Sequence, residues 1–187
     1  MLQADNDSKS DKEKQHTIQQ VAINKVIDWL RQEGLEPQDI THLRKDASYY
    51  GVVIIDESEE TDPEARQRRE AFHIFFPVDR FDSLRISEII IFDLQTQKSY
   101  SSLATKPNGI LDQNRFYFDL ELALLHMNVY FTIKKNIREL QSLEISKVVF
   151  FDGLTKDTLF DTVNVVHNAV KIARIKTSQL RDSCSSS

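Results

Sequence analysis

The stretch KVVFFDGLTKD, residues 147–157, decides how the C-terminal part of the chain folds. Its apolar run is typical of a buried strand, and the turn-forming residues Asp152 and Gly153 then interrupt that run. Thr155 is a good N-cap, because its hydroxyl can accept a hydrogen bond from the first turn of a helix. The stretch therefore predicts a buried last strand, a tight turn and a final helix over 155–176.

A strand that ends in aspartate can also present a phosphoryl-accepting nucleophile. Asp152, and Asp93 in the similar stretch IIIFDLQTQ (89–97), are therefore candidate catalytic residues. Phosphatases of the haloacid dehalogenase type carry Asp-x-Asp-x-Thr at this place, and their second aspartate acts as general acid and base. Two positions later this chain has Leu154 in the first stretch and Gln95 in the second. A small phosphatase or hydrolase using Asp152 or Asp93 is therefore the alternative function, not the leading one.

Composition predicts a cytoplasmic protein with one compact domain. The chain has 187 residues, 40% of them hydrophobic, which is enough for one core. We expect a disordered polar tail over 1–14, a single α+β domain over 15–177 and a flexible tail over 178–187, where the one cysteine, Cys184, lies. The formal net charge of −5 argues against a nucleic-acid partner. No apolar run reaches the roughly 20 residues that span a bilayer, so no membrane partner is expected.

Hydrophobic periodicity predicts the remaining elements. Apolar residues at helical spacing indicate helices, and runs of β-branched and aromatic residues indicate strands. In chain order, the predicted elements are a helix over 17–34, strands over 49–56, 71–78 and 86–94, a helix over 113–127, strands over 129–134 and 145–152, and the final helix over 155–176. Short connections between consecutive strands require antiparallel pairing. The order predicts an α+β fold: helix, three-strand antiparallel meander, helix, two strands, helix.

Particular residues are expected to define the helices. Gly34 is expected to end the first helix, Asp112 to cap the second, and Lys171, Arg174 and Lys176 to lie in the final turns of the third. The first helix is predicted to bury Ile18, Val21, Ala22, Val26, Trp29 and Leu30, the second Phe116, Leu120, Ala123, Leu124 and Met127, and the third Leu159, Val163, Val166, Val170 and Ala173.

The sequence predicts neither a metal site nor a bound cofactor. The histidines are far apart and lack metal-ligand spacing: His16, His42, His73, His126 and His167. His167 is expected on a helix surface. The four glycines are isolated, so no glycine-rich phosphate loop is present. The basic cluster Arg66, Arg68 and Arg69 lies among acidic residues and indicates a solvated loop.

Several predicted strands carry apolar residues on both faces. In AFHIFFPV (71–78) Phe72, Ile74, Phe76 and Val78 share one face, and His73 and Phe75 lie on the other. In YYGVVIID (49–56), SEIIIFDL (87–94) and SKVVFFD (146–152), by contrast, apolar residues occupy both faces. A sheet with helices on one side only would leave such a second face exposed, and a large exposed apolar patch usually marks a partner surface. We therefore expect helices on both faces or a partner, with a homodimer as the first choice.

The stretch ISKVVFFDGLTKDTL (145–159), together with the predicted order of elements, resembles the type III secretion chaperone-like fold. That fold also includes uncharacterised bacterial and archaeal families with a similar strand, Asp-Gly-Leu turn and final helix. The resemblance implies a non-enzymatic module that binds a protein or peptide, commonly as a homodimer, and it supplies no catalytic residue. A small-ligand sensor with a pocket beneath the helix over 113–127 is a further alternative.

Overall fold

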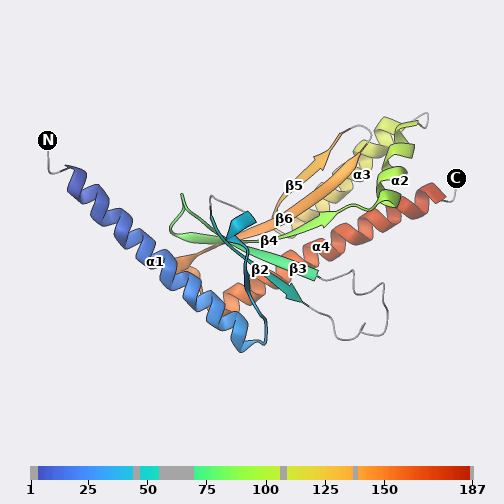
Figure 1. Cartoon of the computed structure of the whole chain (residues 1–187). Helices are drawn as coiled ribbons and strands as arrows, with labels where there is room; N and C mark the ends of the chain where they lie inside the picture. Colours follow the sequence, from blue (N-terminus) through green and yellow to red (C-terminus); the bar gives the residue numbers. More distant parts are fainter. Residues whose placement is uncertain (1–3, 44–46, 55–69, 106–108, 137–138, 186–187) are drawn as a thin grey trace. The chain divides into compact units, whose positions relative to one another are not determined.

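The computed structural model describes residues 4–43, 47–54, 70–105, 109–136 and 139–185 (Figure 1). It has the predicted α+β fold. In chain order the elements are α1 (Ala4–Gln32), β1 (Gln38–Asp39), the 3-10 helix η1 (Thr41–Leu43), β2 (Ala47–Ile54), β3 (Glu70–Pro77), β4 (Ser83–Ile91), α2 (Leu94–Thr105), α3 (Gly109–His126), β5 (Tyr130–Lys135), β6 (Leu140–Phe150), the 3-10 helix η4 (Phe151–Gly153) and α4 (Lys156–Ser185).

The strands form one six-stranded sheet in the order β1-β2-β3-β4-β6-β5. The predicted meander is present, since β2, β3 and β4 are neighbours in chain order. β2 and β3 pair antiparallel from Ala47↔Pro77 to Ile54↔Glu70. β5 pairs antiparallel with β6, starting at Tyr130↔Ser146. β1 and β5 are the edge strands of the sheet.

The chain divides into two compact units. The first comprises Met1–Ile86 and Val148–Thr162, and the second comprises Ser87–Lys147 and Val163–Ser187. α1 and β1 to β3 belong to the first unit, whereas α2, α3 and β5 belong to the second. β4, β6 and α4 contribute residues to both units. The single domain over 15–177 stays a prediction.

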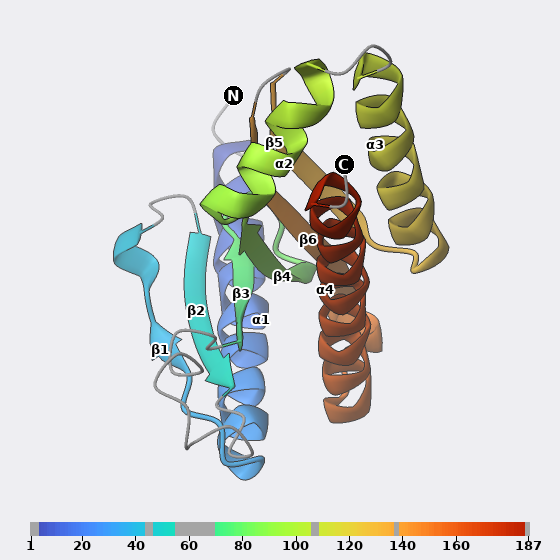
Figure 2. The same ribbon diagram turned by 90° about the vertical axis from the view of Figure 1, so that its right-hand side faces the viewer.

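In the first unit, α1 lies against β3 (Figure 2). Its Gln19 Nε2 donates a hydrogen bond to the Pro77 carbonyl oxygen at 2.8 Å. The buried face of α1 is rotated from the predicted one, because it includes Gln19 and Ile23, while Ile18 and Val21 are exposed. Trp29, which was expected in the core, is only half-buried. The buried apolar residues of α1 are Ala22, Ile23, Val26 and Leu30.

Gly34 ends α1 as predicted. It has φ +75°, in the left-handed region that glycine adopts without strain. The Leu35 N–H donates to the Leu30 carbonyl oxygen, and the Gly34 N–H donates to the Arg31 carbonyl oxygen, both at 3.0 Å. These two bonds form a Schellman motif, which satisfies carbonyls at the helix end.

The second unit contains a helix that the sequence pattern did not predict. The predicted third strand extended to Leu94, but β4 ends at Ile91 and α2 begins at Leu94. α2 buries Thr96, Tyr100 and Leu103, spaced by four and three residues. Gln113 Nε2 on α3 donates a hydrogen bond to the Tyr100 carbonyl oxygen at 2.8 Å, which ties α3 to α2.

Several predicted helix ends are wrong. α3 begins at Gly109, so Asp112 lies within its first turn and does not cap it. α4 extends to Ser185, so Lys171, Arg174 and Lys176 precede its final turns. α1 begins at Ala4, within the segment expected to be a polar tail. The predicted stripe of α4 is confirmed: Leu159, Val163, Val166, Val170 and Ala173 are all buried.

The burial of the two faces of the sheet differs from strand to strand. On β3, Phe72, Ile74 and Phe76 are buried on one face and Phe75 is buried on the other, each at 5% exposure or less. On β4, by contrast, Ile91 is 80% exposed. Both faces of β3 are therefore covered at these residues, whereas the second face of β4 is open at Ile91. That a second copy of the chain covers this face stays a prediction.

Candidate functional site

Asp152 lies in a turn. It belongs to η4, between β6 and α4, and its side chain is exposed. Thr155 then caps α4 as predicted: its Oγ1 accepts a hydrogen bond from the Thr158 N–H at 3.1 Å. In return the Thr155 N–H donates to Thr158 Oγ1 at 2.8 Å, so the two threonines cap the helix reciprocally.

Asp93, the other candidate nucleophile, caps α2. One carboxylate oxygen accepts a hydrogen bond from the Thr96 N–H at 2.6 Å, and the other accepts one from Arg181 Nη1 at 3.1 Å. The hydrogen bonds from Thr96, together with the positive charge of Arg181, hold the pKa of Asp93 below its ordinary value. Asp93 belongs to the second unit and Asp152 to the first.

Asp152 contributes to the rim of a groove in the first unit. The groove has a volume of about 640 Å³. It is lined by four apolar residues and four charged ones: Ile18, Phe81, Phe150 and Phe151, with Asp79, Arg80, Asp82 and Asp152. Ile18 is 55% exposed and Phe150 is 53% exposed, so the groove presents apolar surface to solvent. We call this the acid-rimmed groove.

Three separate segments form the acid-rimmed groove: α1, the β3–β4 turn, and the end of β6 together with η4. Besides the bond from Gln19 on α1 to Pro77, the Phe151 N–H donates to the Asp82 carbonyl oxygen at 2.7 Å. The Phe76 ring of β3 also packs on the Phe151 ring, with centroids 6.3 Å apart. These contacts hold the three walls of the groove together.

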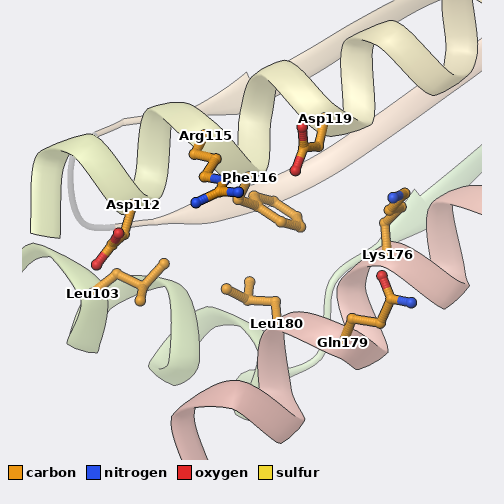
Figure 3. A pocket seen from close by; sticks show the side chains of 8 residues that line it. All are labelled: Leu103, Asp112, Arg115, Phe116, Asp119, Lys176, Gln179 and Leu180. Atoms are coloured by element: carbon orange, nitrogen blue, oxygen red, sulfur yellow. The ribbon is translucent and has the colours of Figure 1, made fainter.

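A second pocket lies in the second unit, where α2, α3 and α4 face one another (Figure 3). Its volume is about 440 Å³. Its lining combines apolar and polar residues: Leu103, Phe116 and Leu180, with Asp112, Arg115, Asp119, Lys176 and Gln179. Both acids and both cations are side by side with apolar surface, so the pocket suits a small ligand with an apolar body and charged ends. This matches the pocket expected beneath the helix over 113–127.

His167 is not the surface residue that the sequence suggested. Its Nδ1 lies 3.2 Å from Glu88 Oε1, and the two side chains are 16% and 5% exposed. The contact joins α4 to β4 within the second unit. In the described ranges of the chain, no cluster of three or more His, Cys, Asp or Glu side chains can hold a metal ion. No helix in those ranges is long and apolar enough to cross a membrane.

α3 has apolar residues on two opposite sides. Leu120 and Leu124 are fully buried, as predicted. Leu111, Phe118, Leu122 and Leu125 are between 43% and 68% exposed. Their spacing of seven, four and three residues places them in one stripe along the side that faces away from the core. We call these four residues the outer stripe of α3.

Sequence patterns do not identify the residues that line the acid-rimmed groove. Phe81 lies in a short connection, and Ile18 was assigned to the core. The aromatic residues in turns next to strands are the one sequence signal for this lining. That signal does not tell which turns lie close together in the fold. The cluster Arg66, Arg68 and Arg69 lies outside the described residues.

Comparisons with known proteins identify a family and a fold. A family model described as "Uncharacterized conserved protein (DUF2299)" matches residues 22–175. The crystal structure of an uncharacterized protein from Methanothermobacter thermautotrophicus is similar to the chain, with a TM-score of 0.69 and 18% sequence identity. The match covers 84% of this chain and 97% of that one, and at this identity it shows the fold alone. No curated protein matches the sequence.

Proposed function

Because the chain belongs to the DUF2299 family of uncharacterized conserved proteins, we propose a function from its own surfaces: a non-enzymatic module that binds a protein or peptide, as a homodimer. The observation that carries the proposal is the acid-rimmed groove. The proposal includes a chaperone-like fold and role, as in type III secretion chaperones, a cytoplasmic location, and no nucleic-acid or membrane partner.

The groove supports peptide binding because its apolar side chains are half-exposed and held on a fixed frame. Burying the exposed part of Phe150 or Ile18 against a partner would contribute about 1 kcal/mol each, from roughly 25 cal/mol per Å² of apolar surface. Preformed walls reduce the ordering cost of binding. The hydrogen bonds to Pro77 and Asp82 provide such walls.

The outer stripe of α3 supports the homodimer. A stripe with spacings of seven, four and three residues has the geometry of a helix-pairing seam. In an antiparallel pair of α3 helices centred on Phe118, Leu111 of one copy would lie opposite Leu125 of the other, since each is seven residues from the centre. The stripe is therefore complementary to itself, as an interface related by a two-fold axis requires.

The groove is tested by binding of an unbiased peptide array to the purified full chain. We expect Phe150→Ser to abolish most of the bound signal, whereas Ile91→Ser, which removes an exposed apolar residue in the second unit, leaves it intact. Equal binding by the wild type and the Phe150→Ser variant would refute the groove as the binding site. Circular dichroism confirms that each variant is folded.

The dimer is tested by size-exclusion chromatography with light scattering at micromolar concentration. We expect a dimer for the wild type and a monomer for Leu122→Asp, because a carboxylate in an apolar seam is left without a partner. Ile175→Asp, at an exposed position of α4 outside the stripe, should remain a dimer. A monomeric wild type would refute the homodimer without affecting the peptide-binding proposal.

A small-ligand sensor is the second candidate function, and the pocket of Figure 3 favours it. A thermal-shift screen of small amphipathic metabolites tests it, with Phe116→Ala as the matched variant. A ligand that stabilises the wild type and not the variant would support the sensor. No shift with any compound of the screen would count against the sensor.

The phosphatase alternative is tested directly. Turnover of a generic phosphomonoester with magnesium, lost in Asp152→Asn or Asp93→Asn, would establish it and refute the non-enzymatic proposal. The cap that Asp93 makes on α2 argues against it, because its carboxylate is already held by Thr96 and Arg181.

A further inference from the structure

We propose that the acid-rimmed groove selects a peptide segment that has an apolar anchor flanked by lysine or arginine. This inference rests on the proposed peptide-binding function and deepens it by naming the class of partner. It follows from the combination of charge and apolar surface at one place in the first unit.

The rim of the groove carries more negative than positive charge. Three aspartates, Asp79, Asp82 and Asp152, line the groove against one cation, Arg80. Within the described part of the chain, neither Asp79 nor Asp152 forms an ion pair. The rim is therefore acidic, and it attracts cationic groups and repels anionic ones.

Apolar surface lies beside those charges. Phe81, Phe150 and Phe151 line the same groove as the aspartates. The methylene stems of lysine and arginine can lie along apolar surface while their charged ends remain near carboxylates and water. Their cations are also attracted to aromatic faces. A basic residue beside an apolar anchor thus satisfies both parts of the groove.

The size of the groove limits how much of a peptide can enter it. A volume of about 640 Å³ accommodates one or two large side chains. Ile18 lines it from the middle of α1, and its other lining residues come from the β3–β4 turn and from the junction of β6 with η4. A short stretch of an extended or helical segment can therefore insert its anchor side chain while flanking basic residues reach the rim. Nucleic acid does not fit, because its phosphates would meet the three aspartates.

The experiment measures the binding of three labelled peptides of equal length to the full chain by fluorescence anisotropy. The first alternates Leu or Phe with Lys, the second replaces each Lys with Glu, and the third keeps Lys but replaces the apolar residues with Ser. We expect the first peptide to bind at least about ten-fold more tightly than the others, and its binding to weaken as salt is raised.

Variants then assign the preference to the groove. The double variant Asp79→Asn with Asp152→Asn should weaken binding of the first peptide about three- to ten-fold. The effect is no larger because exposed charge pairs are individually weak. Asp28→Asn with Asp161→Asn is the matched control: both are exposed acids of the first unit outside the groove, and their loss should change binding less than two-fold. Phe150→Ala should weaken every peptide that carries apolar residues.

The outcomes separate the two proposals. If the glutamate peptide binds as tightly as the lysine peptide, and Phe150→Ala weakens both, the charge preference is wrong and the peptide-binding function stands. If no peptide binds in a way that depends on Phe150, both proposals are wrong. If Phe150→Ala instead converts a dimer into a monomer in light scattering, a second copy of this chain occupies the groove, and the basic-peptide proposal is overturned.

Discussion

Replacing Asp93 tests whether this residue is a structural cap. In Asp93→Ala the Thr96 N–H loses its acceptor and Arg181 loses its ion pair. Loss of an N-cap costs about 1 kcal/mol. The ion pair adds at most about 0.5 kcal/mol, since the Asp93 side chain is 58% exposed. We expect the free energy of unfolding to fall by about 1.5 kcal/mol, measured by urea denaturation.

Two matched variants separate the cap from the charge. Asp93→Asn keeps a cap acceptor but loses the charge, so it should cost only about 0.5 kcal/mol. Asp152→Ala removes an exposed turn carboxylate and should change stability by less than about 0.5 kcal/mol. If Asp93→Ala is as stable as the wild type, the cap has no energetic role and the reasoning is refuted.

The same residue gives stability a defined pH dependence. The folded-state pKa of Asp93 lies below its ordinary value, so its charge stabilises the folded chain at neutral pH. This stabilisation is fully present above pH 3.8, the ordinary pKa of an aspartate side chain. It is lost as the pH falls below that value and through the lower pKa that Asp93 has in the folded chain. The difference between wild type and Asp93→Asn should therefore shrink in acid. A difference that is constant with pH would contradict this cause.

Three further predictions concern other contacts. Thr155→Ala should lower the free energy of unfolding by about 1 kcal/mol in urea denaturation, because the Thr158 N–H at the start of α4 loses its Thr155 Oγ1 acceptor. His167→Ala should cost about 2 kcal/mol in the same assay, since it leaves the 5% exposed Glu88 without this partner; a cost below about 0.5 kcal/mol would show that the contact is not stabilising. Leu124→Ala should lower the free energy of unfolding by about 3 kcal/mol, because it opens a cavity at a fully buried site. Leu125→Ala, at an exposed site, should lower the free energy of unfolding of the monomer by less than about 0.5 kcal/mol. Equal effects of the two variants would contradict the assignment of a buried and an exposed side to α3.

Local sequence signals predicted the parts of the fold that depend on neighbouring residues. The adjacency of β3 and β4 follows from the short connection between two apolar runs, and the cap at Thr155 follows from a threonine just after a glycine turn. The stripe of α4 follows from steps of four and three residues. Each of these signals is contained within a few residues, so no knowledge of the rest of the chain was needed.

The missed features depend on tertiary contacts. α2 (LQTQKSYSSLAT) is mostly polar, so its few buried residues gave a weak helical pattern, although the cap at Asp93 was a usable signal. α1 buries Gln19, because that side chain reaches the Pro77 carbonyl oxygen. The acid-rimmed groove joins Ile18, Phe81 and Phe150 from distant segments. Their proximity is a property of the fold and cannot be derived from spacing.

The edge strand β5 has a consequence for aggregation. An edge strand presents unpaired backbone groups on which another chain can add, and charged side chains oppose such addition. β5 ends in Lys134 and Lys135, and the Lys135 ammonium lies 3.0 Å from the centre of the Tyr117 ring. Two β5 edges that paired in parallel and in register would bring these lysines together, and their charges would repel. The same pair of charges thus discourages fibre-like growth of the sheet by parallel addition at this edge.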